Sequence, residues 1–233
     1  MRALIFAAGL GERMRPLTLT TPKPLLAVGG KPLIVWHIER LAAAGYTRIV
    51  INHAHLGAQI EAALGNGATW DMSIVYSRED TALETAGGIA TALPLIDAEI
   101  FPVVNGDVYV EYDFAQLAKP MSVIAAGDAQ MHLVLVDNPP QHPHGDFVLR
   151  GTRVVESEGD KLTFSGIGVY HRALFADIAP HTKAPLVPLL RAAIASGQAS
   201  GEHYQGRWVD VGTPERLQQL DETLRNQTAS NHV

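Results

Sequence analysis

The sequence predicts an α/β protein with a parallel sheet and a β-rich extension, and two patterns support this. In the first half, short apolar runs alternate with amphipathic segments, the rhythm of a parallel sheet with crossover helices. In the second half, the apolar runs are shorter and turn residues separate them, as in a mixed or antiparallel sheet. No repeat or linker divides the chain, so we expect one domain over residues 1–228 and a frayed tail over 229–233.

The first half is expected to hold four strands and three helices. The continuous apolar run over residues 3–8 predicts a buried strand of a parallel sheet. Pro32 marks the start of a helix, since proline is tolerated in the first turn, and Gly45 marks its end. The other expected elements of this half are strands over 48–52, 72–76 and 101–104 and helices over 56–64 and 87–93.

The second half is expected to form a β-rich lobe followed by two helices. Turn residues interrupt its apolar runs, most densely in the stretch of eight residues that begins at Asn138 and ends at Gly145. The expected strands cover 131–136, 147–149, 153–156 and 162–170, and the expected helices cover 186–195 and 214–225.

The composition is that of a folded globular protein without cysteine chemistry. The 233 residues are 47% hydrophobic and 18% charged, enough to bury a full core. The lack of cysteine excludes disulfides, thiolate metal sites and a cysteine nucleophile, and the net charge of −6 disfavours nucleic acid as a partner. No apolar stretch approaches the roughly 18 to 20 residues that span a bilayer, and the N-terminus lacks the pattern of a signal peptide. We therefore expect a cytoplasmic protein with no membrane partner; its oligomeric state stays open, with a monomer among the possibilities.

The loop after the first strand carries the strongest functional signal. Between residues 9 and 24 it contains two glycines, two arginines, three prolines and a lysine. Ligands of open α/β sheets bind at the carboxyl ends of the strands, and glycines let backbone N–H groups approach phosphate oxygens closely. The alternative is a glycine-rich turn with solvated arginines, because the loop matches neither a dinucleotide fingerprint nor a Walker loop. The density of these residues favours a phosphate-binding loop in which Arg13 and Lys23 neutralise a triphosphate.

Two distant aspartates form a second candidate site. Asp107 ends an apolar strand, and Asp210 lies in an apolar run before a helix. A carboxylate in such surroundings is costly without a partner, and Mg²⁺ is bound by one or two carboxylates together with substrate phosphates. The alternatives are a turn residue for Asp107 and a helix cap for Asp210, although Thr213 is better placed for that cap. Beside a phosphate-binding loop, the metal interpretation is favoured for the pair.

These stretches resemble the signature segments of the sugar-1-phosphate nucleotidyltransferases. The resemblance covers nearly the whole chain in the family's order and rests on Gly9-x-Gly-x-Arg-x-Arg-Pro-x-Thr-x-x-x-Pro-Lys-Pro, Asn105-Gly-Asp and Trp208-Val-Asp-Val-Gly-Thr-Pro. It implies a Rossmann-like α/β/α core with a mixed, mostly parallel sheet and a small β-rich sugar-binding lobe, without the C-terminal β-helix of some members. The chain departs from several relatives at Val155-Glu-Ser, where they have Glu-Lys-Pro, so their lysine contact to the sugar phosphate is not carried over.

Within that family the chain most resembles the uridylyltransferases that act on N-acetylmuramic acid α-1-phosphate in cell-wall recycling. The segments include Leu83-Glu-Thr-Ala-Gly-Gly and Ser200-Gly-Glu-His-Tyr. This implies that UTP and the sugar 1-phosphate give UDP-N-acetylmuramic acid and pyrophosphate, with Mg²⁺. Glu84 stands where guanylyl relatives commonly have glycine, which motivates uracil as the base; the alternative is that a backbone carbonyl reads the base and Glu84 is structural. The alternatives are a mannose-1-phosphate guanylyltransferase or another member of the family, and a catalytically inactive nucleotide-sugar sensor.

The resemblance also implies a role for each matching residue. Asp107 and Asp210 bind the metal and act in catalysis with Arg13 and Lys23. The expected nucleotide contacts are Ala7, Ala8, Gly9, Gly11, Glu12, Arg13, Lys23, Glu84, Gly87 and Gly88. The expected sugar-phosphate contacts are Asn105, Gly145, Asp146 and Glu156. His142 and His144 are candidate donors to the lactyl carboxylate, and the alternative for their turn is a solvated loop with no ligand contact. A phosphate monoester has a second pKa of about 6 and is largely ionised near neutral pH, so no general base is expected.

Overall fold

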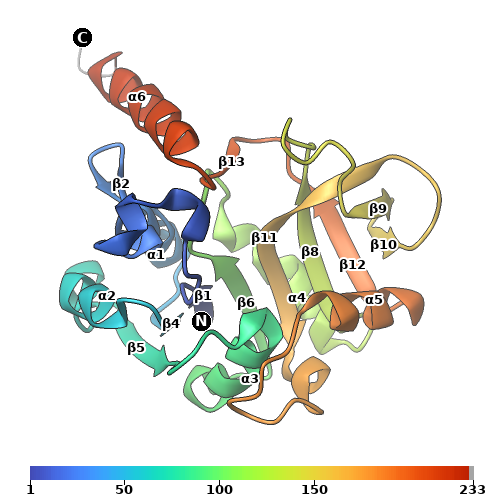
Figure 1. Cartoon of the computed structure of the whole chain (residues 1–233). Coiled ribbons are helices and arrows are strands. Elements are labelled where there is room, and N and C mark those ends of the chain that lie inside the picture. The colour runs from blue at the N-terminus through green and yellow to red at the C-terminus, as the bar shows by residue number, and fades with distance from the viewer. Residues whose placement is uncertain (231–233) are drawn as a thin grey trace.

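A mixed sheet of nine strands runs through the molecule (Figure 1), with strand order β5-β4-β1-β6-β11-β8-β12-β10-β9. The computed structural model describes residues 1–230. The strands of this sheet are β1 (Arg2–Phe6), β4 (Arg48–His53), β5 (Ser73–Arg78), β6 (Ile100–Asn105), β8 (Met131–Val136), β9 (Phe147–Arg150), β10 (Arg153–Val155), β11 (Lys161–His171) and β12 (Ala199–His203). The strands β5, β4, β1 and β6 are parallel, and β11 reverses direction beside β6. The expected parallel core and mixed extension are therefore confirmed as one continuous sheet.

Helices cover both faces of the sheet, which gives the expected α/β/α layers. One face packs against α1 (Leu33–Ala43), α2 (Gly57–Leu64) and α4 (Ala118–Ala125). The other face packs against α3 (Glu84–Ile96) and α5 (Val187–Ala195). Successive side chains of a strand point to opposite faces, so Ala3 and Ile5 of β1 join the first core cluster and Leu4 joins the second.

Two short strand pairs and a long C-terminal helix complete the fold. The pairs are β2 (Ala27–Val28) with β3 (Lys31–Pro32), and β7 (Val108–Val110) with β13 (Trp208–Asp210). Helix α6 (Pro214–Ser230) packs Leu220 and Leu224 against Val28 and Leu33, and its C-terminal part projects from the body (Figure 1).

Several element boundaries differ from the expectation. Helix α3 begins at Glu84, three residues before the expected start at residue 87. Strand β1 ends at Phe6, so the expected strand residues 7 and 8 belong to the following loop. Helix α6 continues through Ser230, two residues into the expected frayed tail; residues 231–233 lie outside the described part of the chain.

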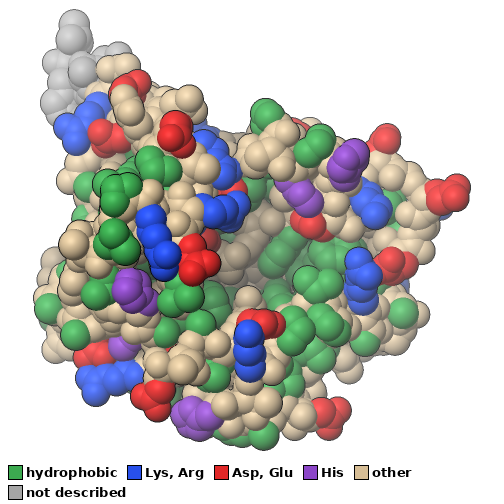
Figure 2. Space-filling model, in the orientation of Figure 1, with side chains coloured by type: hydrophobic (Ala, Val, Ile, Leu, Met, Phe, Trp, Pro, Cys, Tyr) green, Lys and Arg blue, Asp and Glu red, His purple; other side chains and the backbone are tan. Residues whose placement is uncertain are grey.

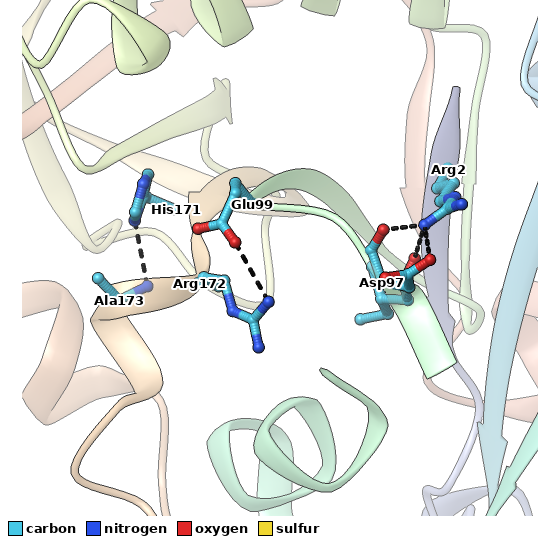
Figure 3. A network of polar contacts seen from close by, with 7 residues as sticks. Arg2, Asp97, Glu99, His171, Arg172 and Ala173 are labelled. Atoms are coloured by element: carbon cyan, nitrogen blue, oxygen red, sulfur yellow. Dashed lines mark hydrogen bonds and ion pairs between the residues drawn. The ribbon is translucent and has the colours of Figure 1, made fainter. Parts of the chain in front are cut away.

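Ion pairs fasten the edge of the sheet at which β1 and β6 begin (Figure 3). Arg2, at the start of β1, binds the Oδ2 oxygen of Asp97 just after α3, and Arg172 Nη1 lies 3.2 Å from Glu99 Oε1. The opposite edge of the sheet, where the parallel strands end, carries the loops described below. None of the helices within residues 1–230 is long and apolar enough to cross a membrane.

Candidate active site

The loop after β1 folds back on itself through a close approach at Gly11. Gly11 has a φ of 64°, and a Cβ atom there would lie 2.8 Å from Thr18 Cγ2 and 3.3 Å from Lys23 Cβ. Thr18 Oγ1 donates a hydrogen bond to the Gly11 carbonyl oxygen at 2.8 Å. Only glycine combines this conformation with this contact. Gly11 therefore allows the end of the loop, with Lys23, to pack against its beginning.

This loop forms one wall of a cavity of about 600 Å³, the loop pocket. Its lining residues are Phe6, Ala7, Gly9, Leu10, Gly11, Glu12, Arg13, Met14, Lys23, Pro24, Thr85, Asn105, Asp107 and Gly212. Six of the expected nucleotide contacts are thus brought together, while Ala8 is buried. Arg13 is exposed and Lys23 is buried, so the pocket offers one solvent-exposed and one buried cation.

The buried cation is neutralised by the first of the two aspartates. Lys23 Nζ donates to Asp107 Oδ2 at 2.7 Å; the lysine side chain is 8% exposed and the aspartate side chain 44% exposed. A buried ammonium is costly without such a partner. The pair therefore joins the loop to the turn after β6 and leaves Asp107 accessible.

The second aspartate is brought beside the first by the β7–β13 strand pair. Asp210 pairs in register with Val108, the residue that follows Asp107. Its Oδ2 oxygen accepts from Arg216 Nη1 at 2.6 Å. The expected cap of α6 is Thr213, whose Oγ1 accepts from the Arg216 backbone N–H at 3.3 Å, so Asp210 is free of the capping role.

Two smaller cavities adjoin the loop pocket. The aspartate pocket, about 270 Å³, shares Asn105 and Asp107 with it and is also lined by Asp210 and His142. The α5 pocket, about 380 Å³, shares Thr85 and Asn105 with it. Asn105 lines all three cavities. Figure 2 shows the hollow in the middle of this face, with charged side chains of both signs around its rim.

The two aspartates fit a divalent cation that arrives with a phosphate. The described residues contain no cluster of three or more His, Cys, Asp or Glu side chains able to hold a metal ion by themselves. Asp107 and Asp210 nevertheless line the same cavity and offer the hard oxygen ligands that Mg²⁺ prefers. Because Mg²⁺ commonly takes one or two carboxylates and completes its shell with waters and substrate phosphates, this donor set suits such an ion.

The expected sugar-side residues are placed unequally. Asn105 lines the cavities directly. Asp146 acts through its neighbours: Oδ2 accepts from the Phe164 backbone N–H at 2.8 Å, and Oδ1 lies 3.0 Å from His142 Nε2. Glu156 is exposed and lies 3.6 Å from Arg191.

Three further expected residues are glycines at close approaches of the backbone. Gly145, at a φ of 57°, forms a turn in which a Cβ would lie 2.7 Å from Asn138 Oδ1. In α3, a Cβ on Gly87 would lie 2.1 Å from the Thr182 carbonyl oxygen and one on Gly88 would lie 2.7 Å from Glu79 Oε1. Both helix glycines therefore allow close packing. His144, one of the two candidate donors to a lactyl carboxylate, is exposed.

A buried polar network beneath the loop was missed by the sequence interpretation. Asn52 Oδ1 accepts from the Ala7 backbone N–H at 2.9 Å, and Asn52 Nδ2 donates to Glu79 Oε1 at 2.7 Å. Glu79 Oε2 accepts from the Leu83 backbone N–H at 3.0 Å, and burial raises the pKa of the Glu79 carboxyl. The network links the loop after β1 to the start of α3. Its sequence signal, one asparagine after an apolar run, is typical of any strand end.

Fold and site together define an α/β protein with a glycine-rich loop and a carboxylate pair at the carboxyl edge of its sheet. The family model described as nucleotidyl transferase matches residues 2–227. The chain belongs to this family, as a sugar-1-phosphate nucleotidyltransferase.

The relatives agree in family and differ in substrate. The N-acetylmuramate alpha-1-phosphate uridylyltransferase of Neisseria meningitidis is 51% identical over 94% of this chain and 96% of its own length. The mannose-1-phosphate guanyltransferase of Schizosaccharomyces pombe is 32% identical over 92% of this chain, which spans 61% of that protein. A solved structure of a putative glucose-1-phosphate thymidylyltransferase from Bacillus anthracis shares the fold, with a TM-score of 0.84, 21% identity and coverage of 97% and 96% of the two chains.

Proposed function

We propose that the protein transfers the uridylyl group of UTP to N-acetylmuramic acid α-1-phosphate, releasing pyrophosphate and UDP-N-acetylmuramic acid, in cell-wall (peptidoglycan) recycling. The observation that carries this proposal is the 51% identity to a uridylyltransferase of that name over nearly the full length of both chains. Because the reaction consumes a nucleoside triphosphate, we place it in the cytoplasm, with Mg²⁺ as the cofactor.

The cavities divide the substrates between them in this proposal. The triphosphate occupies the loop pocket, whose lining includes Gly9, Gly11, Arg13 and Lys23. In this proposal the two glycines allow close contact of the backbone with phosphate oxygens, and the two cations supply positive charge. The sugar phosphate enters the aspartate pocket. Asn105 lines both cavities and is therefore placed between the two reactants.

The chain's own groups position the reactants and balance their charge. An oxygen of the sugar phosphate attacks the α-phosphorus, and the bond from that phosphorus to the pyrophosphate oxygen breaks, which is chiefly a matter of positioning and charge stabilisation. Lys23, held by Asp107 at 2.7 Å, has a fixed direction and needs no reorganisation as charge develops. Mg²⁺ bound by Asp107 and Asp210 would neutralise charge on the two anionic substrates, which otherwise repel.

A guanylyltransferase is the second candidate, because mannose-1-phosphate guanyltransferases are 32% identical over 92% of this chain. The identity to these proteins, 32%, is lower than the 51% identity to the uridylyltransferase, which places this candidate second.

The test is a matrix of pyrophosphate release with UTP or GTP against N-acetylmuramic acid, N-acetylglucosamine and mannose 1-phosphates. We expect the highest kcat/KM with UTP and N-acetylmuramic acid 1-phosphate. Faster turnover of GTP with any sugar phosphate contradicts the proposal and supports the second candidate. Binding of nucleotide by calorimetry without pyrophosphate release in any combination would instead indicate a sensor.

A further inference from the structure

Glu84 has a backbone conformation that a glutamate adopts only at a cost. Its φ is 58°, although it is the first residue of α3. Glycine populates this left-handed region freely, whereas other residues rarely do. The backbone therefore gives no reason for a glutamate here, and the reason must lie in the side chain.

The side chain of Glu84 holds a lysine at the rim of the α5 pocket. Glu84 lines that pocket, and its Oε1 oxygen lies 3.3 Å from Lys183 Nζ. The two side chains are 41% and 68% exposed, so both remain open to a further ligand. An exposed ion pair contributes little to folding stability. The stability gained from this pair therefore does not explain a glutamate with a strained backbone.

The loop that carries Lys183 is fastened to the start of α3. The Ala184 backbone N–H donates to the Leu83 carbonyl oxygen at 3.0 Å, and the Ala86 backbone N–H donates to the Ala184 carbonyl oxygen at 3.1 Å. The lysine backbone is therefore fixed relative to Thr85 and the loop pocket. Glu84 then sets the direction of the lysine side chain.

The α5 pocket has an apolar wall, and one of its lining residues, Glu84, pairs with Lys183. Pro185, Val187 and Leu190 form the wall, and Asn105 connects the cavity to both reactant pockets. A ligand group that joins a methyl to a carboxylate matches such surroundings. Another cation of this region, Arg191, is engaged by Glu156 at 3.6 Å, and His142 is engaged by Asp146 at 3.0 Å.

We propose that Lys183, oriented by Glu84, binds the carboxylate of the lactyl ether of the sugar substrate and so selects the acidic sugar phosphate over its neutral counterpart. The inference rests on the proposed function. The methyl of the lactyl group packs against Val187 and Leu190, and its carboxylate meets the ammonium of Lys183. Selection by this pair is a binding effect at the sugar and leaves the triphosphate site unchanged.

The test compares N-acetylmuramic acid 1-phosphate with N-acetylglucosamine 1-phosphate, which differ by the lactyl group. In Lys183→Met, we expect KM for the acidic sugar to rise about tenfold, the loss of one charge-assisted hydrogen bond, with kcat and the KM of the neutral sugar unchanged. Lys183→Arg should restore most of the preference. The matched control is Lys31→Met, because Lys31 also pairs with a glutamate, Glu39, and should leave the ratio of the two kcat/KM values unchanged.

A double-mutant cycle tests whether Glu84 acts through the lysine. Glu84→Gly should lower the preference for the acidic sugar in the wild-type background and have no further effect on it in Lys183→Met. An unchanged preference in Lys183→Met, with an active wild type, overturns the role of Lys183 and leaves the proposed function intact. A wild-type enzyme that does not use N-acetylmuramic acid 1-phosphate overturns both.

Discussion

The ammonium of Lys23 lies 2.7 Å from the Oδ2 oxygen of Asp107, which joins the loop after β1 directly to the turn after β6. The lysine is buried and the aspartate is partly exposed. One contact therefore fixes the direction of a cation and the position of a carboxylate. Changing either residue is expected to disturb the other.

Replacing Lys23 by alanine should damage turnover more than sugar-phosphate affinity. Removing a contact that stabilises developing charge costs typically about 10² to 10³ in kcat, while KM for the sugar phosphate should change little. Steady-state kinetics with Arg15→Ala as the control checks this, because Arg15 belongs to the same loop and pairs with Glu12 at 3.5 Å. Unchanged kcat in Lys23→Ala removes the lysine from the reaction.

The two aspartates should each be required for turnover without being required for folding. Asp107→Asn and Asp210→Asn keep the size of the side chain and remove a metal-binding charge, so activity should fall below about one-tenth of wild type. Circular dichroism checks the fold. Asp137→Asn, which alters an aspartate paired with His203, is the matched control. The two-aspartate site would be refuted if both site variants kept more than about one-tenth of wild-type activity at saturating Mg²⁺.

The buried Asn52 should couple stability to nucleotide affinity. Asn52→Leu removes the side-chain hydrogen bonds to the Ala7 N–H and to Glu79 Oε1, which should cost about 1 to 3 kcal/mol of unfolding free energy and raise KM for UTP. Urea unfolding and UTP titration measure the two effects. The exposed Asn66, whose side chain accepts from Ala68, serves as the control through Asn66→Ala. Loss of stability with unchanged KM for UTP contradicts the coupling.

Stability should fall in mild acid because of His37. Burial lowers the pKa of this histidine to about 4, and its ring hydrogen-bonds the Val108 carbonyl oxygen at 2.7 Å. Between pH 6.5 and 4 the unfolded chain binds a proton that the folded chain rejects, so the unfolding free energy decreases as pH falls through this window. At pH 5 the loss relative to pH 7 is about 2 kcal/mol.

His37→Gln keeps a donor for Val108 and removes the titration. Urea unfolding at several pH values should therefore show a flatter profile for this variant than for the wild type. Parallel profiles from pH 7 to pH 4.5 would show that the native histidine takes up the proton.

Sequence motifs locate the candidate chemical residues of the site, but they do not indicate the partners of these residues. The glycine-rich loop and the two aspartates stand in recognisable motifs, and the alternation of strands and helices implied the edge at which they meet. The counter-ion of Asp210 depends on how α6 places Arg216, which no local pattern encodes. Strands β7 and β13 have three residues each, too few for a periodic signal, yet their pairing brings the aspartates together.

The residues that position the site were the least predictable. Asn52 and Glu79 are 27 positions apart and meet only because β4 and β5 are neighbours in the sheet. Glu84 was expected among the nucleotide contacts, and no sequence pattern indicated that its side chain also lies 3.3 Å from Lys183 and lines the α5 pocket. The positive φ of Glu84, from which this role was inferred, is a backbone property that sequence patterns of helices do not report.

The central claim is a direct transfer between UTP and the sugar phosphate, and isotope-resolved ³¹P NMR tests it most directly. The protein is mixed with UTP, Mg²⁺ and N-acetylmuramic acid 1-phosphate that carries ¹⁸O in its phosphate. The proposed attack on the α-phosphorus predicts a UDP-sugar that retains the label, together with unlabelled pyrophosphate. Label in the pyrophosphate, or no UDP-sugar while nucleotide remains bound, would contradict the claim.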